Sequence, residues 1–307
     1  MSIPLDAEKI YNALFNAIGE ERELGVLEVT MKYGNSARRA LEKYYDAVYC
    51  EKSFMEDVKS QLSGHFRDVI TYLFMDPIEY DCLEFKNAFP GFTYNQNNIF
   101  ELVTARPHWH LQLVEQKYNQ LYGKDLSTEI TKHFKGDVGR DLNIILHTPR
   151  NENKNPDHDD AQACAKILYE SEPSEWVKNE TIFKDIFATK SPEELILIGR
   201  YYNKKTGITP NIYAEKNLSG KEQVLIREVL YNVCRPAELF AQKIREAVTG
   251  LGTDTNCLNR ILVSRNEIDM TMIRKFYKYY YKVKLQEDVI GDTSGSYQRI
   301  LIELSSK

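Results

Sequence analysis

Two glycine-rich segments near the end of the chain carry the residue types that bind a hard cation. They are GLGTD at residues 250–254 and GDTSG at residues 291–295, and Asp292 follows Gly250 by 42 residues. A glycine loop can direct backbone carbonyl oxygens toward a cation, and an aspartate from a second loop can complete the cage. Ca²⁺ takes about six to eight oxygen ligands, and such a pair of loops supplies most of them. These residue types are therefore compatible with a calcium site, provided that the fold brings the two segments together.

The composition limits what else the chain can bind. It has 307 residues, of which 42% are hydrophobic, and a net charge of −5. That hydrophobic share can bury a core, so disorder is not expected. An acidic protein has no general attraction to anionic lipid or nucleic acid, and binding to either needs a bridging cation. No apolar run reaches the roughly 18 residues of a membrane-spanning helix, the first residues do not resemble a signal peptide, and five scattered cysteines favour free thiols in an intracellular protein.

The sequence contains internal repeats, so the elements that position the two loops recur along the chain. One series of glycines has offsets of 72, 84 and 75 residues: Gly64, Gly136, Gly220 and Gly295. A second series has the same offsets: Gly34, Arg106, Lys190 and Arg265. Their agreement predicts four repeats of roughly 70 residues. The longer middle offset coincides with a polar linker at residues 151–160.

A stripe of apolar side chains follows each marker glycine at i, i+3, i+4 and i+7, as on the buried face of a helix. In repeat one the stripe is Phe66, Val69, Ile70 and Leu73. In repeat four it is Tyr297, Ile300, Leu301 and Leu304. No long alternating pattern predicts a strand, so we expect an all-α fold.

With G-x-G-T-D and G-D-T-S-G in the last of four such repeats, the chain resembles the annexin core over nearly its whole length. The resemblance implies four annexin-type five-helix repeats arranged as a curved disc, with calcium loops on the convex face. The repeats are expected at residues 1–76, 77–150, 151–235 (with the linker) and 236–307. The degenerate first three repeats are similar to those of divergent protist annexins of the α-giardin type.

The resemblance also implies the calcium ligands. Annexins use three backbone carbonyls, at positions i−2, i and i+2 around a loop glycine, and an acidic side chain 42 residues after it. In repeat four these positions are Val248, Gly250, Gly252 and Asp292. A purely structural role is the alternative, in which a glycine ends one helix and Thr253 or Asp254 caps the next. Both roles can hold at once.

The same register gives weaker sites in the other repeats. The positions that correspond to Asp292 are Gln61, His133 and Asn217. A neutral amide offers one oxygen, and a histidine nitrogen is a poor ligand for a hard ion. The loop positions are Ala17, Gly19 and Glu21, then Phe89, Gly91 and Thr93, then Pro173, Glu175 and Val177. We expect these loops to be structural, while Glu20, Glu21 and Glu23 leave an off-pattern site in repeat one open.

Leu251 and Trp176 are the predicted membrane contacts. Leu251 is the apolar residue of GLGTD, and Trp176 lies where some annexins carry a tryptophan that enters the bilayer interface. Tryptophan suits that zone because its ring is apolar and carries one donor. The alternative, that Trp176 packs its own loop, is equally compatible with the sequence.

The resemblance implies calcium-dependent binding to anionic phospholipid membranes, mainly through the repeat-four loop, by a cytoplasmic protein peripheral to the plasma membrane. Ca²⁺ is the implied cofactor, and it would bridge two negatively charged partners. With one complete loop the calcium requirement is expected to be high, because the avidity of several loops is lost. The sequence has no Walker A, G-x-S-x-G or H-E-x-x-H motif, and we expect neither catalysis nor a nucleic-acid partner.

The alternative function is a cytoskeletal or microtubule-associated scaffold in which calcium and lipid binding is secondary. Three degraded loops and the similarity to α-giardins motivate it. The tyrosine-rich run KFYKYYYKVK at residues 275–284 is a candidate partner surface. A helix end with half-buried tyrosines and solvated lysines is the simpler interpretation of that run.

Overall fold

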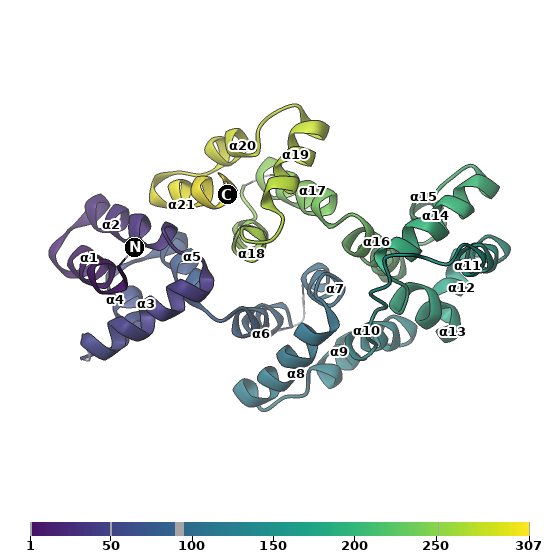
Figure 1. The fold of residues 1–307 in the computed structure, drawn as a ribbon, viewed down its shortest axis with the longest axis horizontal. Coiled ribbons are helices and arrows are strands. Elements are labelled where there is room, and N and C mark those ends of the chain that lie inside the picture. Colours follow the sequence, from purple (N-terminus) through teal and green to yellow (C-terminus); the bar gives the residue numbers. More distant parts are fainter. Residues whose placement is uncertain (1, 50, 90–94, 251, 307) are drawn as a thin grey trace. The chain divides into compact units, whose positions relative to one another are not determined.

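The computed structural model describes residues 2–49, 51–89, 95–250 and 252–306 (Figure 1). Within these residues the regular elements are helices and no strand occurs, so the all-α prediction is confirmed. The helices form four repeats with five helical positions each, as predicted. The chain folds as two compact units, one of residues 1–80 and 237–307 and the other of residues 81–236.

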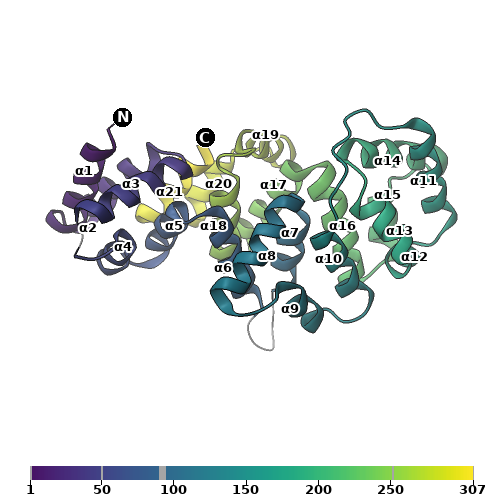
Figure 2. The ribbon, with the colours of Figure 1, turned by 60° about the horizontal axis from the view of Figure 1, so that its bottom comes forward.

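The first unit contains repeats one and four. Repeat one consists of α1 (Ile3–Asn16), α2 (Gly19–Met31), α3 (Asn35–Val48), α4 (Phe54–Gln61) and α5 (Gly64–Phe74). Repeat four consists of α17 (Pro236–Thr249), α18 (Thr255–Arg265), α19 (Met270–Tyr281), α20 (Leu285–Asp292) and α21 (Gly295–Ser306). The last helices of the two repeats, α5 and α21, contact each other and also contact α2 and α18 (Figure 2). The last helices therefore pack repeats one and four against each other within this unit.

The second unit contains repeats two and three. Repeat two consists of α6 (Pro77–Ala88), α7 (Gln96–Thr104), α8 (His108–Tyr122), α9 (Leu126–His133) and α10 (Asp137–His147). Repeat three consists of α11 (His158–Glu170), α12 (Pro173–Lys178), α13 (Glu180–Ile182), the π-helical segment η1 (Phe183–Ala188), α14 (Pro192–Thr206), α15 (Pro210–Asn217) and α16 (Gly220–Cys234). The last helices, α10 and α16, contact each other, α7 and η1, which is the arrangement of the first unit.

The second helical position of repeat three is divided into α12, α13 and η1. Asn179 separates the first two segments, with an extended backbone at ψ 103°. Its side chain accepts hydrogen bonds from the backbone N–H groups of Thr181 (3.0 Å) and Ile182 (3.3 Å). Asn179 therefore ends α12 and caps α13, because an asparagine oxygen satisfies N–H groups that a helix start leaves without partners.

The four marker glycines share a left-handed backbone. Their φ angles are +61° at Gly64, +70° at Gly136, +58° at Gly220 and +63° at Gly295. Each glycine begins or directly precedes the last helix of its repeat. A Cβ atom disfavours this conformation, so glycine recurs where each repeat turns into its last helix.

The apolar stripe that follows each marker glycine is buried, apart from Tyr297 on α21, which is half-buried. Phe66, Val69, Ile70 and Leu73 on α5 are at most 3% exposed. Burial of one such side chain contributes about 1.5–3 kcal/mol. Asp141 is the polar member of the stripe on α10, and it accepts hydrogen bonds from Arg140 (2.8 and 2.9 Å). Burial raises the pKa of Asp141 to about 7 against the opposing effect of that guanidinium.

Candidate calcium site in repeat four

The repeat-four loop, residues 250–254, joins α17 to α18. The backbone N–H of Asp254 donates to the carbonyl oxygen of Ala247 (2.9 Å), which closes the loop on the end of α17. The Asp254 carboxylate accepts from the backbone N–H of Cys257 (3.0 Å) and caps α18. The predicted capping role is confirmed for Asp254. The loop that is a candidate calcium ligand is thus also a structural helix junction.

The two glycines of this loop differ in what they require. Gly252 has φ +84°, a left-handed backbone that a side chain disfavours. Gly250 is outside that region, and a Cβ built on it lies 3.7 Å from the Gly252 carbonyl oxygen, an ordinary contact. The loop conformation therefore depends on the absence of a side chain at Gly252, while Gly250 has room for one.

A hydrogen bond joins the repeat-four loop to the turn between α20 and α21. The Thr253 hydroxyl donates to the backbone carbonyl oxygen of Asp292 (2.9 Å). On the other side of that turn, the Gln298 amide donates to the carbonyl oxygens of Ile290 (2.9 Å) and Thr293 (2.5 Å). The two segments that sequence analysis paired are therefore in direct contact through Thr253 and Asp292.

The Asp292 carboxylate has an unsatisfied oxygen. Its Oδ2 atom is shielded from solvent and has no hydrogen-bond partner among the described residues. A shielded carboxylate oxygen without a partner is costly, because it loses water and gains nothing in exchange. A hard cation beside the loop would satisfy it, so the donor set at this place fits calcium.

The electrostatics around Asp292 agree with that fit. Burial, together with the negative charges of Asp254 and Asp292, raises the pKa of the Tyr297 phenol, which stays neutral. The phenol donates to the Asn259 side-chain oxygen (2.8 Å) and not to either carboxylate. The negative potential of the two carboxylates is therefore left for a cation.

The predicted ligands are mostly backbone atoms. The Val248 side chain is 6% exposed and packs in the core, so this residue would contribute its carbonyl oxygen. Over the described ranges no group of three or more His, Cys, Asp or Glu side chains is arranged to hold a metal. Val248, Gly250, Gly252 and Asp292 remain the predicted ligand set. Leu251, the predicted membrane contact of this loop, lies outside the described residues.

In repeats two and three, the residues that align with Asp292 make other contacts. The His133 ring lies 5.0 Å from the Phe89 ring, and its Nδ1 atom is 2.8 Å from the Glu129 carbonyl oxygen. Asn217 donates its amide to the Tyr213 carbonyl oxygen (2.8 Å). These contacts agree with structural roles. Gly91 and Thr93 lie outside the described residues.

The off-pattern alternative in repeat one is not supported by the placement of its glutamates. Glu20 forms an ion pair with Arg299 on α21 (2.5 Å). Glu23 accepts a hydrogen bond from the Ser296 hydroxyl on the same helix (2.6 Å). Two of the three carboxylates are therefore used between repeats one and four, and they do not converge with Glu21 on a common point.

Trp176 is buried, which contradicts the predicted membrane contact. Its side chain on α12 is 0% exposed, and its indole N–H donates to the Ser171 hydroxyl (3.1 Å) and the Leu168 carbonyl oxygen (3.3 Å). The ring packs near Phe187 and Tyr202. The donor and the apolar ring are both satisfied inside repeat three, so the packing alternative is the correct one in this structure.

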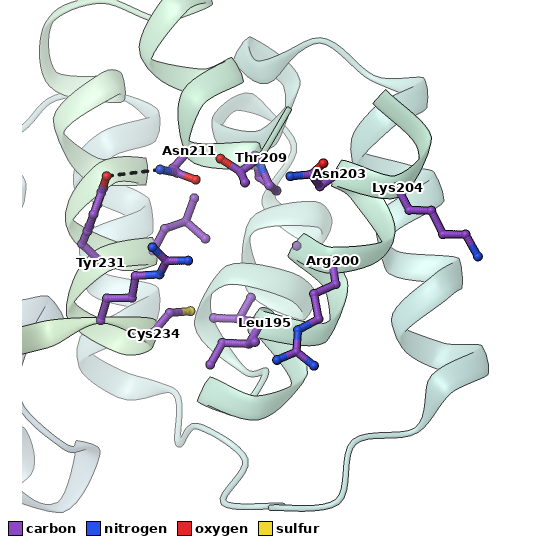
Figure 3. A pocket seen from close by; sticks show the side chains of 13 residues that line it. Leu195, Arg200, Asn203, Lys204, Thr209, Asn211, Tyr231 and Cys234 are labelled. Atoms are coloured by element: carbon purple, nitrogen blue, oxygen red, sulfur yellow. Dashed lines mark hydrogen bonds between the residues drawn. The ribbon is translucent and has the colours of Figure 1, made fainter. Parts of the chain in front are cut away.

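A hollow of about 520 Å³ in repeat three is distinct from the candidate site. It lies between α14, α15 and α16, and Figure 3 shows the hydrogen bond between Asn211 and Tyr231 (3.2 Å) on its wall. Arg200 and Lys204 are among its lining residues, and the Lys204 side chain extends away from Tyr231 (Figure 3). The lining contains no carboxylate, so this hollow does not fit calcium.

The fold and the site define a helical protein of four repeats, in which the shielded Asp292 Oδ2 atom has no hydrogen-bond partner among the described residues. The annexin family model matches residues 80–142 and 239–304. Annexin A3 from Homo sapiens is 30% identical over 302 residues, which span 98% of this chain and 92% of that protein. The chain therefore belongs to the annexin family, whose members in general bind phospholipid in a calcium-dependent manner and are not enzymes.

Solved structures give the same family fold. Annexin III matches with a TM-score of 0.92 and 29% identity, over 100% of this chain and 94% of its own. Calcium-bound annexin (Sm)1 matches with a TM-score of 0.88 and 25% identity, over 100% of this chain and 90% of its own. Calcium-bound alpha-14 giardin matches with a TM-score of 0.81 over 99% of each chain, and its 18% identity makes this a likeness of fold alone. None of the described helices has the length and hydrophobicity to span a bilayer.

Proposed function

We propose that this protein binds anionic phospholipid membranes in a calcium-dependent manner, mainly through the repeat-four loop. The predicted ligands are the carbonyl oxygens of Val248, Gly250 and Gly252 and the carboxylate of Asp292. The observation that carries the proposal is the shielded Asp292 Oδ2 atom, which has no partner among the described residues. The calcium-bound state of annexin (Sm)1 supports the choice of ion.

Two hydrogen bonds of the protein hold the predicted ligands in place, and the charge of the protein requires a bridging cation. Thr253 fixes the Asp292 backbone against the loop, and Asp254 fixes the loop against α18. One bound calcium ion would supply the positive charge that bridges a protein of net charge −5 to an anionic surface. A single carboxylate gives modest affinity for calcium alone, so a lipid phosphate oxygen is expected to complete the shell. Calcium and lipid should then strengthen each other's binding by the same factor.

Co-sedimentation with phosphatidylserine vesicles tests the proposal. We expect the wild-type protein to pellet in calcium and to stay in the supernatant in chelator. Asp292→Asn keeps the side-chain shape and removes the charge, and it should raise the calcium concentration for half-maximal pelleting by at least about tenfold.

Glu303→Gln is the matched control, because Glu303 is an exposed carboxylate of the same repeat. It removes one negative charge without touching the loop and should pellet like the wild type. Equal pelleting of Asp292→Asn and Glu303→Gln across the calcium titration would contradict the assigned site.

A cytoskeletal role is the second candidate, and one surface feature favours it. Tyr279 and Tyr280 at the end of α19 are 66% and 48% exposed, and Lys282 and Lys284 beside them are also exposed. Aromatic residues next to cations suit an acidic protein surface such as that of a microtubule. Pelleting with microtubules in chelator separates the two functions, since the lipid proposal expects no binding there.

A further inference from the structure

Arg22 joins the two loops of repeat one that correspond to the candidate calcium site of repeat four. Its Nε atom donates to the Ala17 carbonyl oxygen (3.1 Å), and its Nη1 atom donates to the Gln61 carbonyl oxygen (2.9 Å). Ala17 is the first carbonyl position of the loop, and Gln61 is the position of Asp292. The guanidinium therefore lies between the loop and the turn that would enclose a cation.

The repeat register shows which residue Arg22 replaces. Repeats one and four differ by 231 residues, so Arg22 aligns with Thr253 and Gln61 aligns with Asp292. The Thr253 hydroxyl donates to the Asp292 carbonyl oxygen, and Arg22 donates to the corresponding carbonyl oxygen of Gln61. The same cross-loop hydrogen bond is therefore made by a neutral hydroxyl in repeat four and by a cation in repeat one.

A guanidinium can satisfy the carbonyl oxygens at this position when no calcium ion is bound. It is permanently charged and donates in several directions, so it can satisfy carbonyl oxygens that converge on one point. It also repels a second cation and bonds to the Ala17 carbonyl oxygen, which is the first predicted ligand position of this loop. With neutral Gln61 in place of a carboxylate, the position that carries the acidic ligand in repeat four has no negative charge in repeat one.

In the second unit, an arginine of repeat two donates hydrogen bonds to the loop of repeat three. Arg140 on α10 donates to the carbonyl oxygens of Val177 and Lys178. Val177 is the third carbonyl position of the repeat-three loop, and Asp137 (2.8 Å) and Asp141 (2.8 Å) hold the guanidinium there. An arginine therefore engages a predicted carbonyl ligand in two of the three repeats that lack the acidic residue.

We propose that Arg22 is an internal cation, which holds the two loops of repeat one together in the place of a calcium ion and excludes calcium from that repeat. Arg22 then joins the two loops of repeat one at every calcium concentration, whereas in repeat four an ion would add to the hydrogen bond between Thr253 and Asp292. This proposal concerns repeat one and rests on the repeat-four site only for the comparison of the two loops.

Hydrogen–deuterium exchange in chelator tests the closing role. Arg22→Met keeps the length of the side chain and removes the charge and the donors. We expect about tenfold faster exchange in residues 17–24 and 59–64, the loss that removal of a charged hydrogen-bond donor produces. Arg39→Met is the control, because Arg39 belongs to the same repeat and forms an ion pair with Asp76, between α5 and α6. No increase over the control in either segment would overturn the proposal.

Calcium stoichiometry by calorimetry tests the excluding role. A matched pair of variants differs only at residue 22: Glu21→Gly/Gln61→Asp keeps Arg22, and Glu21→Gly/Arg22→Thr/Gln61→Asp carries the repeat-four residue. We expect the triple variant to bind one calcium ion more than the double variant, and equal counts would overturn exclusion by Arg22. If the repeat-four site itself fails, both counts fall by one and the difference between the variants remains.

Discussion

The loops of repeats one and four in the first unit lie at equivalent positions of the same five-helix scaffold. Different side chains join the loop to the neighbouring turn in the two repeats. In repeat four, Gly250 and residues 252–254 lie outside the helices, Gly252 is left-handed, and a threonine hydroxyl joins the two segments. In repeat one, α2 already begins at Gly19, whereas α18 begins at Thr255, the counterpart of Leu24. The helix thus takes up most of the loop, and Arg22 joins the segments.

The two repeats differ in the donor that joins the two segments as well as in the residue at the acidic position. Converging carbonyl oxygens still need donors when they are shielded from water. Repeat one supplies these donors from Arg22, within its own second helix. Repeat four instead leaves a carboxylate oxygen without a partner among the described residues, and a cation from solution would satisfy it. The two repeats therefore differ at two pairs of positions: Arg22 and its counterpart Thr253, and Gln61 and its counterpart Asp292.

The largest expected effect comes from placing a side chain on the left-handed glycine of each loop. Gly252→Ala and Gly19→Ala should each destabilise the protein by about 1–2 kcal/mol, because φ is +84° at Gly252 and +56° at Gly19. Only Gly252→Ala should also weaken calcium binding, by about tenfold, since the loop relaxes away from its open conformation. Thermal unfolding and calcium calorimetry measure the two effects. Weaker calcium binding in Gly19→Ala would contradict the assignment of calcium binding to repeat four and not to repeat one.

A smaller effect is expected from the hydroxyl that joins the repeat-four segments. Thr253→Val removes one hydrogen bond to the Asp292 carbonyl oxygen, which costs about 0.5–1.5 kcal/mol and should lower calcium affinity about threefold. Thr249→Val is the matched control, because its hydroxyl donates within α17 to the Arg245 carbonyl oxygen (2.7 Å). Calcium titration of both variants gives the answer. If Thr249→Val loses as much calcium affinity as Thr253→Val, the hydrogen bond between Thr253 and Asp292 does not contribute specifically to calcium binding.

The repeats could be predicted from sequence because the features that mark them depend on residues close together in the chain. The marker glycines recur where the backbone is left-handed, and the apolar stripe on each last helix follows the period of the helix. Both depend on neighbours within one turn, so spacing alone reveals them. The capping role of Asp254 was predictable for the same reason.

Side-chain partners between distant segments could not be predicted in this way. Trp176 occupies a loop position in the register, and its burial depends on Phe187, Tyr202 and Ser171, which the sequence does not place beside it. Arg22 left one usable signal: a basic residue stands where repeat four has a threonine. That signal predicts a charge in the loop, but only the geometry shows that it bonds to Ala17 and Gln61.

The smallest expected effect separates the two glycines of the repeat-four loop, which the G-x-G pattern treats as equal. Gly250 is not left-handed, and a Cβ there meets the Gly252 carbonyl oxygen at 3.7 Å and the Glu246 carbonyl oxygen at 3.8 Å. Gly250→Ala should therefore change the free energy of unfolding by less than about 0.5 kcal/mol and calcium affinity by less than about twofold. Calorimetry of Gly250→Ala beside Gly252→Ala makes the test. A loss at Gly250 as large as that at Gly252 would mean that the loop moves in the bound state until the Gly250 backbone also requires glycine, and that the conformation seen here is not the one that binds calcium.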